Sequence, residues 1–153
     1  MSEVPKRKVR IEIDPGAEEE IVIRCKALTP ELETLRRMAL GEGEELLLTL
    51  GEEEFFIPRG DILFFESVGG KTAAHTASRM FYTAHKLYEL EELLAGSFLR
   101  VSKSCILNLR AVSLIRRDMT GSCEVRFTGS GKKVYVSRMY YKTFRETLLE
   151  MRK

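Results

Sequence analysis

Short apolar segments separated by polar or glycine-containing turns are the feature that most limits what this sequence can fold into. They follow one another from residue 45 to residue 136, as "ELLLTL", "EFFIP", "DILFFESV", "KTAAHTA", "RMFYTA", "FLRV", "CILNL", "AVSLIRR", "CEVRF" and "KKVYV". Segments of this length, bounded by turn residues and rich in branched and aromatic side chains, are typical of β-strands. We therefore predict a mainly β (α+β) fold built from many short strands.

Two segments of the same region have helical spacing instead. One is "KLYELEELLAG", which ends at Gly96, and the other is "SRMYYKTFRETLLEMRK", for which Ser137 is the expected N-cap. The apolar face consists of Leu87, Leu90 and Leu94 in the first segment and of Tyr140, Phe144 and Leu148 in the second. This spacing predicts a short helix in the middle of the domain and a C-terminal helix.

The beginning of the chain has a different pattern. Residues 8–13 ("KVRIEI") and 19–28 ("EEIVIRCKAL") are predicted to be two strands. Thr29-Pro30-Glu31 is typical of a helix start, because threonine caps a helix and proline is tolerated in its first turn. These signals predict a small strand-strand-helix unit.

The segment "GEGEE" at residues 41–45 marks the expected boundary. We predict an N-terminal unit over residues 1–44 and a second domain over residues 45–153. Two hypotheses follow for the unit. It forms a homodimer when an exposed edge of either strand pairs with its twin in a second subunit, or it merely covers one side of the core.

Composition limits the classes of protein to consider. No apolar run approaches the roughly 20 residues that span a bilayer, and the N-terminus lacks the apolar stretch of a secretory signal. We therefore predict a cytoplasmic protein without direct membrane insertion. Cys25, Cys105 and Cys123 lie in strand-like segments and are expected to be buried thiols. His75 and His85 have no neighbours at metal-ligand spacing, so no metal site is predicted.

Motifs of enzymes are not found in the sequence. The segment "TGSGKK" at residues 128–133 lacks the spacing of a phosphate-binding loop and joins two predicted strands, so we interpret it as a turn. No nucleophile-elbow pattern is present. The sequence therefore indicates neither an enzyme nor a cofactor.

Charge is distributed unevenly along the chain. Residues 1–65 carry 9 Lys and Arg against 15 Asp and Glu, whereas residues 66–153 carry 16 against 8. Such separation is typical of a basic working surface beside an acidic part, although chance clustering on solvated faces would give the same counts.

Three basic residues stand at the ends of predicted elements. Lys71 follows two glycines, which let the backbone approach a partner closely. Lys103 lies between two serines in a polar break between strands. Arg138 lies in the first turn of the last helix, where the helix dipole disfavours a cation unless an anion such as phosphate lies beside it. Together they favour nucleic-acid binding.

From about Asp61 to Leu148 the sequence resembles the LytTR DNA-binding domain of bacterial transcriptional regulators. Four segments carry the resemblance, in the family's order and spacing. "DILFFES" is similar to the family's "I-x-Y-I-E" strand, and "LYELEELL" to its "L-x-x-L-E-x-x-L" helix. "FLRVSKSCILNL" is similar to its "F-x-R-V-H-R-S-x-I-V-N" segment, and "VYVSRMYYKTF" to its closing "V-S-R-x-Y".

The resemblance implies a mostly β fold that inserts loops, rather than a recognition helix, into double-stranded DNA. The positions that it implies as DNA contacts are Lys71, Thr72, Ser102, Lys103 and Arg138. Asn108 matches the asparagine of the family motif and is expected to bond a turn backbone. Ser137 is expected to support the same DNA-binding segment.

One departure from the family pattern bears on specificity. The family's "H-R-S" is Ser102-Lys103-Ser104 here. Arginine can bind guanine O6 and N7 with two parallel bonds, whereas lysine is a flexible point charge. We therefore expect either that the central contact is made mainly to phosphates or that the preferred DNA sequence differs from that of typical members. Lys132 is expected to add a sequence-independent phosphate contact.

Many LytTR proteins carry a phosphoacceptor receiver domain ahead of the DNA-binding part, but residues 1–44 are too few for one. We therefore expect a response regulator-like transcriptional regulator without a receiver domain. The alternative is a protein-interaction module that partners a membrane sensor, with DNA contact secondary. Affinity for nucleic acid that does not depend on salt would favour this alternative.

Overall fold

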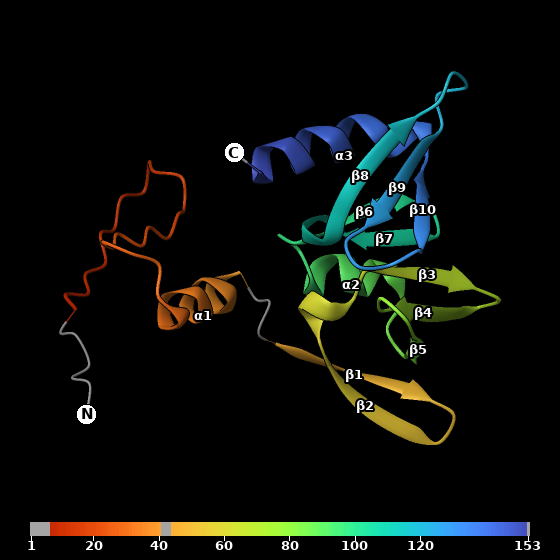
Figure 1. The fold of residues 1–153 in the computed structure, drawn as a ribbon, viewed down its shortest axis with the longest axis horizontal. Helices are drawn as coiled ribbons and strands as arrows, with labels where there is room; N and C mark the ends of the chain where they lie inside the picture. The colour runs from red at the N-terminus through yellow and green to blue at the C-terminus, as the bar shows by residue number, and fades with distance from the viewer. Residues whose placement is uncertain (1–6, 41–43, 153) are drawn as a thin grey trace.

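The computed structural model describes residues 7–40 and 44–152, and within them ten strands form two antiparallel sheets (Figure 1). The larger sheet has the order β2-β1-β5-β4-β3-β7-β6, and the smaller has the order β10-β9-β8. In chain order the strands are β1 (Glu45–Leu50), β2 (Glu53–Pro58), β3 (Phe64–Val68), β4 (Lys71–His75), β5 (Met80–Thr83), β6 (Phe98–Ser102), β7 (Cys105–Asn108), β8 (Val112–Arg117), β9 (Cys123–Phe127) and β10 (Lys133–Val136). Each of the ten predicted strand segments therefore contains a strand.

The described residues also form three α-helices. They are α1 (Pro30–Ala39), α2 (Leu87–Leu93) and α3 (Arg138–Met151). Helix α2 packs against β3, β6 and β7, and α3 packs against β6 and β10. The predicted mainly β fold with a short middle helix and a C-terminal helix is confirmed. No helix in the described part of the chain is long and apolar enough to cross a membrane.

The larger sheet separates two apolar cores. On the face covered by α2, the side chains of Phe65 and Ile106 are fully buried. On the opposite face, Phe64 and Leu107 are buried together with Phe144 of α3. Successive side chains of a strand point to opposite faces, so adjacent residues of β3 and β7 enter different cores. Burial on both faces explains the unbroken apolar runs at residues 62–65, which lead into β3, and at residues 105–107 of β7.

The two strands predicted over residues 8–13 and 19–28 are not formed. The structure describes turns and irregular backbone there, and Val9, Ile11 and Ile13 are 89%, 86% and 89% exposed. The alternation of apolar residues is present in the sequence, but a strand is stable only when further strands pair with it and its apolar face is covered. Cys25 is exposed as well, contrary to its predicted burial, whereas Cys105 and Cys123 are buried.

Helix α1 begins where the sequence predicts it. The Thr29 hydroxyl oxygen accepts a hydrogen bond from the backbone N–H of Leu32 at 3.3 Å, as an N-cap does. Residues 41–43 lie outside the described residues. The division between residues 1–44 and residues 45–153 therefore stays a prediction.

Candidate nucleic-acid interface

Two turns that are far apart in the sequence lie at the same end of the larger sheet. Strands β3 and β7 are adjacent and antiparallel. Beyond their last paired residues, the backbone N–H of Ser67 donates to the carbonyl of Ser104 at 2.9 Å. The β3–β4 turn at residues 69–70 is therefore a neighbour of the β6–β7 turn at residues 102–104.

Helix α3 begins at this end as well. The backbone N–H of Ser137 donates to the carbonyl of Val101 on β6 at 2.9 Å, which places Arg138 beside the end of that strand. The β8–β9 loop reaches the same place, because the Arg138 guanidinium donates to the carbonyl of Thr120. We call this surface the loop end. It consists of residues 69–71, 102–104, 116–122 and 137–138, and the β3–β4 and β8–β9 turns mark it on the right of Figure 1.

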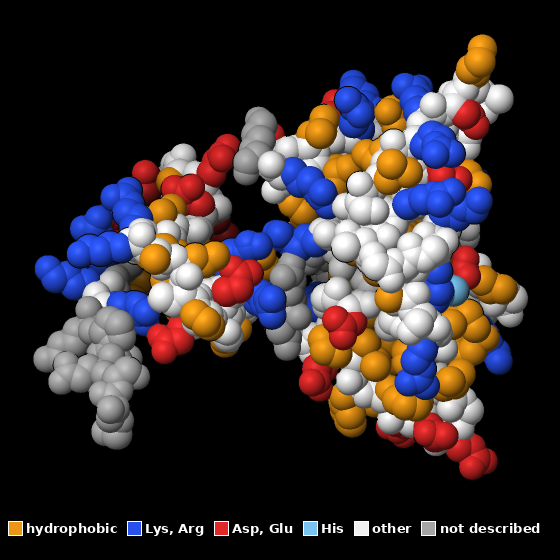
Figure 2. Space-filling view, viewed as in Figure 1, with side chains coloured by type: hydrophobic (Ala, Val, Ile, Leu, Met, Phe, Trp, Pro, Cys, Tyr) orange, Lys and Arg blue, Asp and Glu red, His pale blue; other side chains and the backbone are white. Residues whose placement is uncertain are grey.

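Basic side chains are prominent on the loop end. Lys71, Lys103 and Arg138 are all exposed. Arg116 and Arg117, at the end of β8, are exposed too and add two positive charges that the sequence analysis did not single out. Figure 2 shows Lys and Arg side chains gathered over the smaller sheet and the start of α3. A concentration of one sign of charge attracts a polyanion from solution.

Lys71 and Thr72 differ in what they offer a partner. Gly69 and Gly70 have φ angles of 57° and 81°, which residues with a side chain rarely adopt, so the turn depends on glycine. Lys71 follows as the first residue of β4, exposed, with its Nζ 5.5 Å from the centre of the Tyr82 ring. Thr72 is only 6% exposed. It lies in the buried part of β4, so in this structure it is not available for the contact predicted for it.

The break at Ser102-Lys103-Ser104 is an ordered turn that follows a β-bulge between Arg100 and Ser102. The Ser102 hydroxyl accepts from the N–H of Ser104 at 3.2 Å. The Arg100 guanidinium donates to the carbonyls of Ser102, at 2.9 Å, and of Lys103, and it pairs with Glu91. The Arg100 side chain therefore joins the turn to α2. The Lys103 side chain projects from a backbone that these bonds hold in place.

Arg100 braces the turn through contacts that the sequence analysis did not identify. It stands at the arginine of the family's "F-x-R-V" pattern, but its contacts to the two carbonyls depend on the folded turn. We expect Arg100→Met to weaken DNA binding by roughly tenfold, because ordering free backbone costs about 1–2 kcal/mol per residue. Fluorescence anisotropy with a labelled duplex measures this, and urea unfolding checks that the variant is folded.

The Arg100→Lys variant separates bracing from charge. Lysine keeps the positive charge but cannot donate to both carbonyls with the planar geometry of a guanidinium. If Arg100 acts through the turn, the lysine variant binds DNA as weakly as the methionine variant. Wild-type affinity in the lysine variant would contradict the bracing role and would show that charge alone matters.

Arg138 lines a small surface cavity of about 270 Å³. The other lining residues are Thr120, Ser122, Tyr135, Val136 and Ser137, four of which carry hydroxyl groups. Ser137 is the N-cap residue of α3, as predicted, but its side chain forms no hydrogen bond to the helix backbone. Hydroxyl groups, a guanidinium and the first N–H groups of a helix are donors that suit a phosphate oxygen.

Asn108 has the contacts of a residue that fixes a turn. It is 3% exposed; its side-chain amide donates to the carbonyl of Ile62 at 3.0 Å, and its side-chain oxygen accepts from the N–H of Arg110 at 3.0 Å. These bonds join the end of β7 to the segment before β3. Asn108 thereby holds the two strands whose far ends carry the neighbouring turns of the loop end.

Lys132 lies near the other end of β4 from Lys71. Its Nζ donates to the carbonyl of Arg79 at 2.6 Å and lies 3.2 Å from His75 Nδ1, whose ring is bonded in turn to Glu66. Burial lowers the pKa of both Lys132 and His75. Lys132 is therefore a contact between the two sheets, which does not fit the phosphate contact expected of it. The segment "TGSGKK" connects β9 and β10, as predicted.

Other reactive groups do not form a site in the described part of the chain. No three His, Cys, Asp or Glu side chains come together there in a way that could hold a metal ion. Burial raises the pKa of the Cys105 thiol to about 12, so this group stays protonated at neutral pH and is a poor nucleophile.

The sequence and the fold of this chain are similar to those of known proteins. Residues 52–149 match the family model of the LytTr DNA-binding domain. The CO-responsive transcriptional regulator RcoM of Rhodospirillum rubrum is 31% identical over 77% of this chain. The matched region covers 59% of the length of RcoM. An uncharacterized HTH-type transcriptional regulator of Staphylococcus aureus is 28% identical, over 71% of this chain and 74% of its own. The LytTr DNA-binding domain of a Bacillus cereus response regulator has the same fold, with a TM-score of 0.64 at 24% identity over 69% of this chain and 96% of its own. The chain therefore belongs to the LytTR DNA-binding domain family.

Proposed function

We propose that the chain binds double-stranded DNA in a sequence-specific manner through the loop end and acts as a transcriptional regulator. The observation that carries the proposal is the placement of Lys71, Lys103 and Arg138 at one end of the domain. They come from three separate segments, yet all three are exposed at the same end. A surface with only a structural role does not require three exposed cations at one end of the domain.

Binding would combine an electrostatic and a reading component. Lysine and arginine side chains displace condensed counterions from phosphates, so the affinity falls steeply as salt rises. Side chains on the turns then reach base edges in the major groove, where each base pair presents a distinct pattern of donors and acceptors. The β3–β4 and β6–β7 turns are neighbours, so they contact adjacent parts of one site.

Arg138 is the residue to which we assign base reading. An arginine can form two parallel bonds to guanine, and a good contact of this kind contributes roughly 1–3 kcal/mol of discrimination. Lys71 and Lys103 contact phosphates in this proposal. In the structure, the Arg138 guanidinium is bonded to the Thr120 carbonyl, and DNA would replace that partner.

The test is a selection of bound duplexes from a random DNA library, followed by affinity measurements at low and high salt. We expect one enriched motif and a steep loss of affinity with salt. Arg138→Ala should reduce the preference for the enriched motif about 5- to 150-fold, the range that corresponds to losing one base contact. It should leave binding to unrelated duplexes nearly unchanged.

Lys133→Ala is the matched control, because Lys133 is an exposed cation at the start of β10, away from the loop end. Its removal should leave the enriched motif and the preference for it unchanged. An Arg138→Ala variant that still selects the wild-type motif with full preference would contradict the assignment. Retention of DNA without any enriched motif would contradict sequence-specific binding.

A protein-interaction module is the second candidate function. The observation in its favour is the exposure of large apolar side chains before the first strand, which include Ile11, Ile21, Leu28 and Met38. A membrane sensor is one partner of this kind. An affinity for nucleic acid that is indifferent to salt would favour this candidate over DNA recognition.

A further inference from the structure

Strand β2 is an open edge of the larger sheet. It pairs with β1 on one side only and stands first in the strand order. The opposite edge, β6, is packed against α3 and β10. An open edge presents unpaired N–H and C=O groups, onto which a further strand can add.

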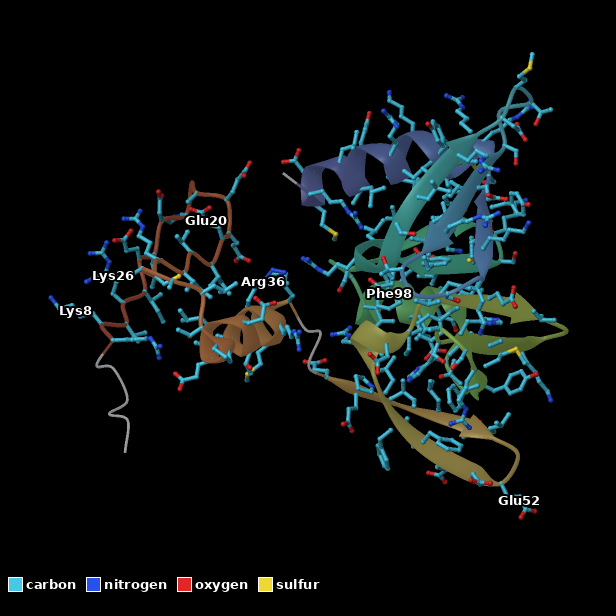
Figure 3. All side chains as sticks on the ribbon, viewed as in Figure 1. Lys8, Glu20, Lys26, Arg36, Glu52 and Phe98 are labelled. Carbon is cyan, nitrogen blue, oxygen red and sulfur yellow. The ribbon has the colours of Figure 1, made fainter. Side chains whose placement is uncertain are left out.

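The β1–β2 hairpin also exposes apolar surface. Phe56 lies directly opposite Leu47 in the pairing of the two strands, and they are 68% and 48% exposed. Figure 2 shows hydrophobic side chains over this part of the molecule and acidic side chains at its lower tip, where Figure 3 labels Glu52. The edge is therefore acidic at the turn and apolar along the strand.

Residues 8–13 have the complementary property. Their alternating apolar side chains are almost fully exposed, and no strand is formed. The charged residues of the segment have only weak partners: Arg10 pairs with its neighbour Glu12 at 3.1 Å, with both side chains more than three-quarters exposed. An exposed pair of this kind contributes little to stability. The segment thus has the sequence pattern of a strand but pairs with none of the described strands.

The order of charges matches the segment to β2 in one direction. Residues 8–13 are basic first and apolar later, and residues 52–57 are acidic first and apolar later. In a parallel alignment, Lys8 and Arg10 lie beside Glu52 and Glu54. In the same alignment, Ile11 lies beside Phe55 and Ile13 lies beside Ile57. An antiparallel alignment with Arg10 beside Glu54 would instead bring Glu12 next to Glu52, and neighbouring like charges are unfavourable.

The arm that contains this segment lies away from its own hairpin. In Figure 1 helix α1 stands between them, and in Figure 3 Lys8 and Glu52 lie at opposite sides of the molecule. The β2 edge of one chain is thus open, and residues 8–13 of the same chain lie away from it. A second copy can cover both the edge and the arm at once, because a twofold exchange makes each contact twice.

We propose that residues 8–13 of one chain add to β2 of a second copy as a parallel strand, so that two copies exchange their N-terminal arms in a symmetric dimer. Ile11 and Ile13 extend the core on the side of Phe55 and Ile57, which are partly buried already. The docking surface involves no residue of the loop end. The inference therefore stands whether or not the loop end binds DNA.

Charge reversal tests this inference with the full chain. Sedimentation velocity of the wild type should show a monomer–dimer equilibrium at micromolar concentration. The Arg10→Glu and Glu54→Arg variants should each raise the dimer dissociation constant by about tenfold or more, because each places like charges together in both contacts. Lys26→Glu, which reverses an exposed charge outside residues 8–13, should behave as the wild type does.

A mixture of the two single variants decides where the segment docks. In one contact of the mixed dimer, the substituted arm of Arg10→Glu meets the substituted β2 of Glu54→Arg, which pairs a glutamate with an arginine. The other contact keeps the native pair of Arg10 and Glu54, so both contacts are complementary. We expect a heterodimer of wild-type stability from two variants that are monomeric alone. A mixture that stays monomeric would overturn exchange between copies. So would a wild type that is monomeric throughout, including one in which the arm docks on its own β2.

DNA binding is measured separately on the same variants. The anisotropy titration with a duplex that holds a single site reports on the loop end alone. Loss of the dimer with retained binding to this duplex would support both proposals. Dimerisation without any DNA binding would contradict the proposed function and leave the arm exchange intact.

Discussion

Replacing Asn108 with alanine is expected to lower the free energy of unfolding of the LytTR domain by roughly 2–5 kcal/mol. The side chain is buried and bonds two backbone groups, the carbonyl of Ile62 and the N–H of Arg110. Alanine leaves the buried carbonyl of Ile62 and the part-buried N–H of Arg110 without these partners, and an unsatisfied buried group costs about 1–3 kcal/mol. Urea unfolding followed by circular dichroism measures the change.

Ser113→Ala is the matched control for Asn108. The Ser113 hydroxyl also donates to a backbone carbonyl, that of Arg126 at 3.3 Å, but the residue is exposed and water can take its place. We expect a change within about 0.5 kcal/mol for an exposed site of this kind. Equal effects of the two substitutions would show that the bonds of Asn108 are not those that fix the ends of β3 and β7.

The second large effect is expected for Phe144→Ala. Phe144 is fully buried in the core between α3 and the sheets. Truncation of a buried phenylalanine typically costs about 3–5 kcal/mol, which includes the cavity that remains. Since α3 carries Arg138 at its start, a loosened helix should also weaken DNA binding under conditions in which the domain remains folded.

Met139→Ala provides the comparison on the same helix. Met139 follows Arg138 and is 79% exposed, so its truncation removes little buried surface. We expect its midpoint of urea unfolding to equal that of the wild type. If Phe144→Ala unfolded at the wild-type urea concentration, the packing of α3 described above would be wrong.

The strands of the domain could be predicted because the signal for each is local. Turn residues bound most of the segments from β1 to β10, and the apolar runs at residues 62–65 and 105–107 are continuous because both faces of the sheet are buried there. The same reasoning was wrong for residues 8–13 and 19–28. Their pattern matches that of a strand, but a strand also needs a neighbouring strand to pair with. The local sequence does not show which segment that neighbour is.

The candidate site was predictable in position and not in detail. Chain order alone identified Lys71, Lys103 and Arg138, since each follows or precedes a turn or cap. The family resemblance implied Thr72 as a contact, but Thr72 is 6% exposed because β4 is buried from Thr72 to Ala74. The contacts of Arg100 and Lys132 join residues distant in sequence, or depend on a bulge, and only the folded chain shows them.

The two cores on either side of β3 and β7 determine where the length of this chain can change. Deleting or inserting one residue within either strand would turn every following side chain to the other face, and so exchange the contents of both cores. A turn of the loop end can gain or lose residues without this penalty, because its side chains face water. Evolution can therefore alter what the domain recognises by lengthening turns, while the strands that carry them keep a fixed count.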